Sequence, residues 1–327
     1  MIDVTAIGEL LIDFTQTKNA DEEKVSFVRN PGGAPANVLA ALAKLKRKTA
    51  FIGKVGNDSF GQYLEKVLID SRVDTKGLSF SNEIPTTLAF VHLDKEGDRS
   101  FSFYRSPGAD MMLQTEDVDS EILGQSKIVH FGSLSLTDEP ARTASLTAIE
   151  QAKAMGKIIS FDPNYRSQLW KSENHARVMM KKGLQQADIV KLSEEEFYLL
   201  AGGKELREGT DYLMKENQVS LLFVTTGSGG CIFRRGEDFG KVGGMKVKAV
   251  DTTGAGDAFV GGILHKVIEF NVLPSQLKLH EVTEMARFAN VVAALSVTKK
   301  GGIPSMPLYE EVKQLFNSEG SHQHVKA

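Results

Sequence analysis

The chain has 327 residues, 41% of them hydrophobic, which suffices for one large α/β domain or two smaller ones with a buried core. A formal net charge of −3, with both signs mixed along the chain, argues against an electrostatic nucleic-acid-binding protein. A single cysteine, Cys231, excludes a disulfide framework and a cysteine zinc site. The N-terminal residues do not resemble a signal peptide, and no run approaches ~20 apolar residues. We therefore expect a cytoplasmic protein that binds neither membranes nor nucleic acids.

Short apolar runs alternate with helical patterns along most of the chain. This alternation predicts a mainly parallel sheet with helices on both faces, that is, a three-layer α/β/α core. The predicted strands are residues 3–8, 49–53, 128–132, 158–162, 189–192 and 221–225. The predicted helices are residues 35–45, 60–71, 139–155, 173–186, 194–201, 210–216, 257–269 and 275–297.

Two segments near the N-terminus depart from this alternation. Residues 24–29 and 87–105 resemble strands, with a tight turn at residues 95–98, and Phe101 and Phe103 share one face because side chains alternate along a strand. We expect residues 14–31 and 86–107 to form a small sheet that covers a substrate site as a lid. Such a lid could also pair with that of a second subunit in a homodimer. The alternative is an antiparallel edge of the main sheet.

Candidate hydroxyl-binding groups follow the first predicted strand. Asp13 comes after it, at the edge where open α/β sheets place their ligands. The pair Gly32 and Gly33 lets the backbone approach a ligand, and Asn37 lies one turn into the next helix. Carboxylate and amide side chains can hold adjacent sugar hydroxyls in a fixed geometry. The alternatives are a surface-loop acid at Asp13 and a tight turn at the glycines.

Two arginines are candidates for binding a substrate or a phosphate. Arg105 ends the second lid segment and could reach a substrate below it, or it could remain solvated. Asn164 and Arg166 follow the predicted strand 158–162, so they fall on a loop at the carboxyl edge of the sheet. The planar fork of Arg166 could neutralise a phosphoryl group during transfer.

Two later segments allow either a structural or a functional interpretation. Residues 191–196 fit an N-capped helix start, with Ser193 followed by acids in the first turn. Residues 225–230, with the sequence TTGSGG, follow a strand and offer backbone N–H groups to a ligand. The alternative for this second segment is a plain hairpin turn.

Residues 251–264 are the most informative segment of the chain. Gly254, Ala255 and Gly256 precede Asp257, and an apolar helical pattern follows. A glycine-rich turn that opens a helix leaves backbone N–H groups unpaired where the helix dipole favours negative charge. This predicts a phosphate cradle in which Asp257 accepts a proton from a hydroxyl that attacks phosphorus. The alternatives are a dinucleotide-binding turn and a helix start with an acid in its first turn.

Two separate motifs resemble those of a known family. Residues 32–45 (GGAPANVLAALAKL) and residues 251–257 (DTTGAGD) are similar to the two signatures of the ribokinase-like (PfkB) carbohydrate kinases. Their order matches the family, and they lie more than 200 residues apart, so the pair is far more specific than either motif alone. The resemblance implies a ribokinase-like fold with a β-sheet lid and an ATP-dependent sugar kinase domain over residues 1–316. A loose polar tail is expected at residues 317–327, where His322 and His324 are not metal ligands.

The resemblance also implies roles for individual residues. The candidate catalytic residues are Gly254, Ala255, Gly256, Asp257 and Arg166. The candidate sugar-binding residues are Asp13, Gly32, Gly33, Asn37, Phe101, Phe103, Arg105, Asn164 and Asp257. The candidate ATP-binding residues are Lys191, Thr225, Gly227, Ser228, Gly230, Ala255, Gly256 and Asn290. Mg²⁺ would be reached by Glu196 through water, and K⁺ is an option at Asp251, Thr253, Ser296, Lys299, Gly301 and Ser305.

The sugar itself is expected to be fructose, because residues 103–113 are similar to the fructokinase branch of the family. The expected product is fructose 6-phosphate. 2-Keto-3-deoxygluconate kinase, ribokinase and aminoimidazole riboside kinase remain alternatives, since Arg105 with Arg166 could hold an acidic sugar. A dehydrogenase is disfavoured because the Rossmann fingerprint is absent, and a non-catalytic sugar-binding regulator is disfavoured by the intact Asp257.

Overall fold

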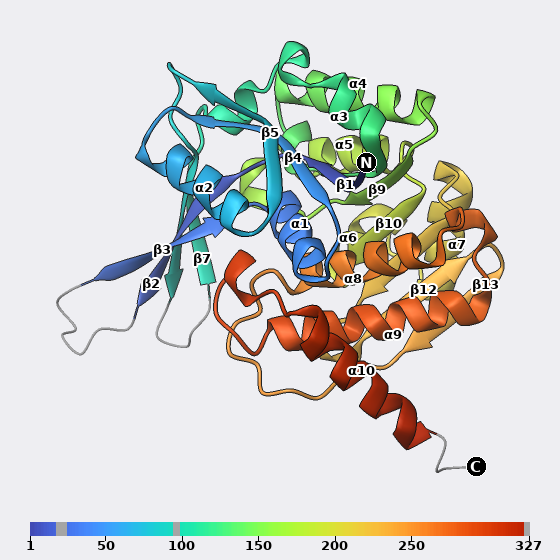
Figure 1. Cartoon of the computed structure of the whole chain (residues 1–327). Coiled ribbons are helices and arrows are strands. Elements are labelled where there is room, and N and C mark those ends of the chain that lie inside the picture. Colours follow the sequence, from blue (N-terminus) through green and yellow to red (C-terminus); the bar gives the residue numbers. More distant parts are fainter. Residues whose placement is uncertain (18–24, 94–98, 324–327) are drawn as a thin grey trace.

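The computed structural model describes residues 1–17, 25–93 and 99–323, and its centre is a nine-stranded sheet (Figure 1). The strand order is β13-β12-β11-β10-β9-β8-β1-β4-β5. The parallel strands are β1 (Ile2–Ile7), β4 (Thr49–Gly56), β5 (Val73–Ser81), β8 (Ser126–Gly132), β9 (Ile158–Asp162), β10 (Ile189–Ser193) and β11 (Leu221–Thr225). An antiparallel edge consists of β12 (Cys231–Arg235) and β13 (Asp238–Val242).

Helices cover both faces of this sheet, which gives the three expected layers (Figure 1). On one face lie α1 (Ala34–Lys44), α2 (Ser59–Asp70), α8 (Ala255–Phe270), α9 (Leu279–Ser296) and α10 (Tyr309–Gln323). On the other lie α3 (Ser120–Gln125), α4 (Ala141–Ala154), α5 (Glu173–Leu184), α6 (Glu194–Ala201) and α7 (Leu206–Asn217). Successive residues of one strand enter opposite cores: Leu221 and Phe223 pack on one side, Leu222 on the other. Burial on both faces explains the continuous apolar runs of these strands.

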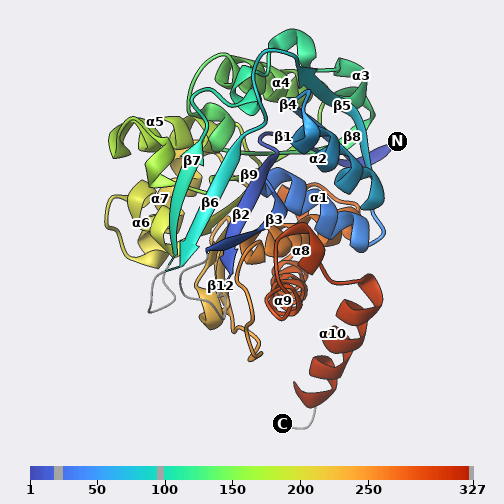
Figure 2. The same cartoon turned by 90° about the vertical axis from the view of Figure 1, so that its left-hand side faces the viewer.

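The lid is a separate four-stranded sheet that projects from the core (Figure 2). Its order is β3-β2-β6-β7, with β2 (Leu11–Thr17), β3 (Ser26–Gly32), β6 (Leu88–Leu93) and β7 (Arg99–Tyr104). The alternative of an edge on the main sheet is therefore wrong. The expected turn at residues 95–98 lies outside the described residues, and so do residues 18–24 of the first predicted lid segment. The strands β3, β6 and β7 overlap the predicted strands 24–29 and 87–105, whereas β2 was not predicted as a strand. Phe101 lies in β7, but its side chain is outside the described part of the chain.

Some sequence-based expectations need correction. Asp13 lies within β2, so the alternative of a surface-loop acid is wrong. The region from 317 to 323 is helical rather than loose, because α10 continues to Gln323. His324 lies outside the described residues, and so does the side chain of His322. Across residues 1–17, 25–93 and 99–323, no helix combines the length and apolar composition needed to span a membrane.

Candidate active site

A cavity of about 620 Å³ opens at the carboxyl edge of the main sheet, between the core and the lid. The first turn of α8 forms one wall, with Gly254, Ala255, Gly256 and Asp257. Gly254 caps the helix at φ 77°, a left-handed conformation that glycine adopts without strain. The early N–H groups of a helix have no intrahelical partner, so this turn offers positive dipole ends to an anion in the cavity.

Asp257 has the environment of a proton acceptor. Its side chain is almost buried, with 7% of the residue exposed, and its Oδ2 accepts a hydrogen bond of 2.7 Å from Nδ2 of Asn37. Burial, helped by the negative charge of Asp162, raises the pKa of Asp257 to about 6, although Asn37 and Lys191 act against the rise. A carboxyl group with this pKa is ionised at neutral pH and can take up a proton.

The sugar-binding candidates come together at the lid end of the cavity. Asp13, Gly33 and Asn37 line it, joined by Phe103 from the lid. Gly33 has φ 118°, and a Cβ there would lie 2.4 Å from the carbonyl oxygen of Glu9, so only glycine fits. Loss of solvent around Asp13 raises its pKa to about 6, and the charge of Asp257 acts in the same direction. Gly32 does not line the cavity among the described residues, but a Cβ on it would collide with Asp13 Oδ2 at 2.2 Å.

A buried ion pair lies beside the α8 turn. Lys191, from β10, contacts Oδ2 of Asp162 at the end of β9, with 3.1 Å between the atoms. A Cβ on Gly256 would be only 2.8 Å from Lys191 Nζ, so the ammonium adjoins the candidate phosphate cradle. Burial acts to lower the pKa of Lys191, but Asp162, Glu196 and Asp257 outweigh it and raise the pKa, so the charge persists. Lys191 was expected to bind ATP from the sequence, whereas Asp162 was not among the predicted site residues. In the sequence, Asp162 is marked by its place at a strand end alone.

The loops after β9 and β10 complete this wall. Asn164 and Arg166 line the cavity, and NH1 of Arg166 donates to the carbonyl oxygen of its neighbour Tyr165 at 2.9 Å. Glu196 also lines it, but both of its oxygens accept backbone amides, from Tyr165 and Ser193, at 2.7 Å each. Ser193 in turn caps α6, so the capped-helix interpretation of this segment is confirmed.

The nucleotide-binding candidates are only partly at the cavity. Thr225 and Gly227 line it, whereas Ser228, Gly230 and Asn290 do not among the described residues. The amide of Asn290 donates to the carbonyl of Gly243 at 3.0 Å, and a Cβ on Gly230 would meet the Val242 carbonyl at 2.2 Å. These residues therefore hold the loop after β13 against the turn at 227–230.

Comparison with known proteins identifies the family. The pattern of the pfkB family carbohydrate kinases matches residues 1–308. The chain belongs to this family. It is 42% identical to "Probable fructokinase-7" of Arabidopsis thaliana, over 97% of this chain and 93% of that protein.

Solved structures agree with this assignment and with the ribokinase-like fold. The fructokinase from Xylella fastidiosa with bound ATP superposes with a TM-score of 0.89 at 32% identity, covering 98% of this chain and 100% of that one. A double mutant of the fructokinase from Vibrio cholerae O395, in the fructose, ADP and potassium ion bound form, gives a TM-score of 0.86 at 33% identity. That comparison covers 96% of this chain and 98% of the other.

Arg105 of this pfkB-family kinase is not placed as the sequence suggests. It does not line the main cavity among the described residues, and its guanidinium is buried. Its Nε and NH2 contact Asp110 Oδ2 at 2.8 and 2.7 Å, NH1 donates to Thr137 at 3.0 Å, and NH2 to Leu134 O at 3.0 Å. With its donors and its charge engaged in this way, Arg105 anchors the end of the lid rather than reaching down to a substrate.

The candidate potassium loop is held together by Asp251. Its Oδ1 accepts from the amide and hydroxyl of Thr253, and its Oδ2 from the amide of Gly301 at 2.9 Å. Lys299 instead pairs with Glu311 at 3.1 Å. The hydroxyls of Ser296 and Ser305 bond carbonyls within their own turns. An ion here would therefore depend on backbone carbonyls, and the Lys299 ammonium is directed elsewhere.

Proposed function

We propose that this kinase transfers the γ-phosphoryl group of ATP to the primary hydroxyl of D-fructose, giving fructose 6-phosphate. The observation that carries the proposal is the position of Asp257, in the first turn of α8 at 2.7 Å from Asn37, within a cavity that also holds Asp13 and Gly33. The similarity to the fructokinases of Arabidopsis thaliana and Vibrio cholerae O395 supports fructose as the sugar.

We assign each of these residues a role in binding or catalysis. Asp13, Gly33 and Asn37 bind and orient the sugar so that its primary hydroxyl faces Asp257. Asp257 takes the proton of this hydroxyl as its oxygen attacks the γ-phosphorus in line and ADP leaves. Because the transition state is loose, the hydroxyl needs little activation by the base until late in the reaction. The N–H groups of the α8 turn, with Lys191 and Arg166, stabilise charge on the transferring group. Closure of the lid excludes water and so limits ATP hydrolysis.

A divalent ion, taken to be Mg²⁺, would supply charge neutralisation across the β- and γ-phosphates when bound. Glu196 fits this ion only indirectly, because both of its oxygens already accept amide hydrogens. We therefore assign it a contact through water. The loop of Asp251, Thr253 and Gly301 would hold a potassium ion through carbonyl groups, next to the α8 turn.

The charge around the cavity favours a neutral sugar over an acidic one. Among the described lining residues the cations are Arg166 and Lys191, and Lys191 is already paired with Asp162. Arg105 is neutralised by Asp110, so the lid end presents the acids Asp13 and Asp257 without it. A sugar carboxylate placed there would meet like charges.

A panel of sugars with ATP and Mg²⁺ tests this proposal. We expect kcat/KM for fructose to exceed that for 2-keto-3-deoxygluconate, ribose and aminoimidazole riboside by roughly 100-fold or more, because buried polar groups without partners penalise a wrong substrate. The measurement is ADP release, with the product identified by NMR. A preference for 2-keto-3-deoxygluconate would contradict the assignment to fructose. Tight sugar binding without turnover would favour a regulator, and NAD reduction would favour a dehydrogenase.

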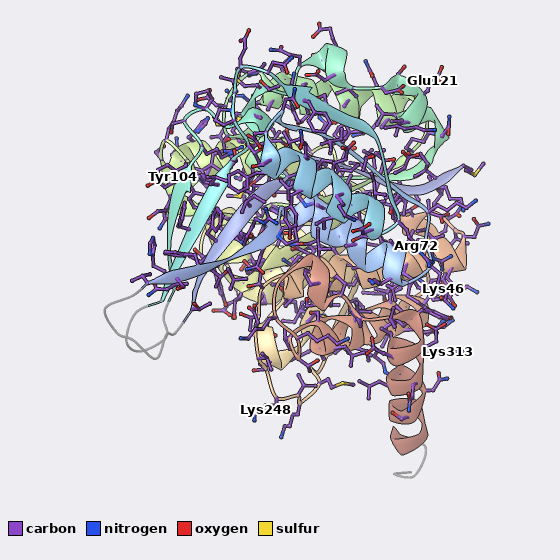
Figure 3. All side chains as sticks on the ribbon, turned by 60° about the vertical axis from the view of Figure 1, so that its left-hand side comes forward. Lys46, Arg72, Tyr104, Glu121, Lys248 and Lys313 are labelled. Atoms are coloured by element: carbon purple, nitrogen blue, oxygen red, sulfur yellow. The ribbon has the colours of Figure 1, made fainter. Side chains whose placement is uncertain are left out.

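We also propose that the enzyme is a homodimer joined through the lid. Phe14 of β2 and Phe90 of β6 stack with 5.0 Å between ring centroids, and Phe27 of β3 and Tyr104 of β7 contact the Phe90 ring edge-on. Tyr104 is 67% exposed at the margin of the molecule (Figure 3). An aromatic surface of this kind suits burial against a second copy.

Substitution of Tyr104 by Asp is expected to convert this dimer to a monomer, because it places a charge within the proposed apolar contact. Light scattering after size exclusion gives the mass directly. Leu273→Asp is the matched control, since Leu273 is also exposed, at 53%, but lies between α8 and α9, outside the lid strands. A wild-type monomer, or equal masses for wild type and Tyr104→Asp, would exclude the lid as the interface.

A further inference from the structure

Glu9 is a buried acid for which the mechanism above has no use. It lies between β1 and β2, with 2% of the residue exposed, and it lines the main cavity. No cation bonds its carboxylate: within the described residues, Oε2 has no hydrogen-bond partner at all. Burial, helped by the charge of Asp110, raises the pKa of Glu9 to about 7, although the backbone N–H groups of Glu9 and Ala34 and the charge of Arg105 act against the rise. Since a buried carboxyl group with few partners costs free energy, the contact that its other oxygen makes is informative.

That contact is with the start of α1. Oε1 of Glu9 accepts the backbone N–H of Ala34, the first residue of the helix, at 3.0 Å. The N-cap position is Gly33, which has no side chain that could accept this hydrogen. Glu9 therefore supplies, from 25 residues upstream, an acceptor for one of the N–H groups at the helix start that have no partner within the helix.

The same end of α1 carries the amide that contacts the proposed base. The N–H of Asn37 closes the first helical turn on the carbonyl of Gly33 at 3.0 Å. From this turn, Asn37 Nδ2 donates to Asp257 Oδ2 at 2.7 Å. The turn also packs tightly on Glu9, because a Cβ on Gly33 would lie 2.4 Å from the Glu9 carbonyl oxygen. A shift of the helix start would thus move Asn37 relative to Asp257.

We propose that Glu9 is a positioning residue for phosphoryl transfer: by accepting the Ala34 amide hydrogen it fixes the start of α1, and with it the direction in which Asn37 donates to Asp257. This inference rests on the proposed function, in which Asp257 is the base. Glu9 itself acts through α1 and does not touch the reacting atoms.

Three substitutions distinguish the loss of the hydrogen-bond acceptor of Glu9 from changes in the volume and the charge of its side chain. Glu9→Gln keeps an oxygen that can accept from Ala34, Glu9→Leu removes the acceptor but fills the space, and Glu9→Asp keeps a carboxylate that is too short to reach. We expect Glu9→Gln to retain kcat within about twofold. We expect Glu9→Leu and Glu9→Asp to lose roughly tenfold or more in kcat with a smaller change in the sugar KM, because small misplacements of catalytic groups cost rate.

The pH profile distinguishes positioning from a general loss of stability. Asn37 lowers the pKa of Asp257, as Lys191 and Arg166 also do, while Asp162 raises it. Asp13 faces Asp257 with a pKa also raised to about 6, so it contributes to the same acid limb. Weakening the Asn37 contact should therefore move the Asp257 part of the acid limb of kcat/KM from about pH 6 to higher pH in Glu9→Leu and Glu9→Asp. Asn37→Ser should move the limb in the same direction, and the Glu9→Leu/Asn37→Ser double variant should add little to either single change.

A carbon-13 NMR titration of the Asp257 carboxyl group reads the same coupling without turnover, so it remains valid if fructose is not the substrate. An unchanged limb and an unchanged Asp257 titration in a folded Glu9→Asp protein, with only a lower melting temperature, would overturn the proposal. So would fully additive effects of the Glu9 and Asn37 substitutions. If wild type itself failed to phosphorylate any sugar, the proposed function would fail while the titration still decided the role of Glu9.

Discussion

Replacement of Asp257 by Asn is expected to lower kcat for fructose phosphorylation by roughly 10²–10⁴-fold, the usual contribution of a positioned general base. The amide has nearly the shape of the carboxylate, so contact with Asn37 can persist and the KM values for fructose and ATP should change much less. Steady-state kinetics, with binding of both ligands measured by calorimetry, checks the separation of kcat from binding.

The pH dependence should follow the same group. Because burial raises the pKa of Asp257 to about 6, the base becomes protonated as the pH falls through this value, and the wild-type rate should fall with it. The residual rate of Asp257→Asn should lack the part of this limb that Asp257 contributes, while the part due to protonation of Asp13, whose pKa is also raised to about 6, should remain. Asp188→Asn is a suitable control. Asp188, which precedes β10, also has a raised pKa, but it accepts a hydrogen bond from the amide of Ile159 in β9 and does not line the cavity among the described residues. A near-normal rate in Asp257→Asn would place the base elsewhere.

The sequence predicted the bounds of strands most accurately where the strands are buried on both faces. Residues 221–225 (LLFVT) and 158–162 (IISFD) are short and mainly apolar, and the structure has strands with these same bounds. By contrast, β5, β12 and β13 were not predicted, since they lie at or near the edges of the sheet and carry charged residues that make the pattern ambiguous. An edge strand need bury only part of its surface, so its sequence is less constrained.

The candidate site divides in a similar way. The roles of Gly33 and the α8 turn could be predicted, because both depend on the local backbone conformation that glycine residues allow. The prediction that Arg105 binds the sugar differs from the structure. The sequence shows an arginine at a strand end but does not show that its guanidinium pairs with Asp110. Likewise Lys191 and Asp162 lie on adjacent parallel strands and meet only in the folded sheet. Contacts across elements decide which charged groups remain available to a ligand.

Lys191→Met is expected to lower kcat by roughly 10²–10³-fold, in the range found when one preorganised electrostatic contact to a transition state is lost. The ammonium adjoins the candidate phosphate cradle, and Met fills a similar volume without charge. The acid limb of the pH profile should also move to higher pH, because Lys191 lowers the pKa of Asp257 while Asp162, left without its partner, continues to raise it. Kinetics between pH 5 and 9 measures both effects.

Stability must be separated from catalysis in this variant, because removal of one partner of a buried ion pair leaves an uncompensated charge that costs about 3–5 kcal/mol. The double variant Lys191→Met/Asp162→Asn removes both charges, so the melting temperature should largely recover while kcat stays low. Lys266→Met is the matched control: Lys266 is also buried and paired, with Glu284 at 2.7 Å, but it does not line the cavity among the described residues. If kcat recovered along with stability in the double variant, Lys191 would serve the fold of the sheet edge and not the transferring phosphoryl group.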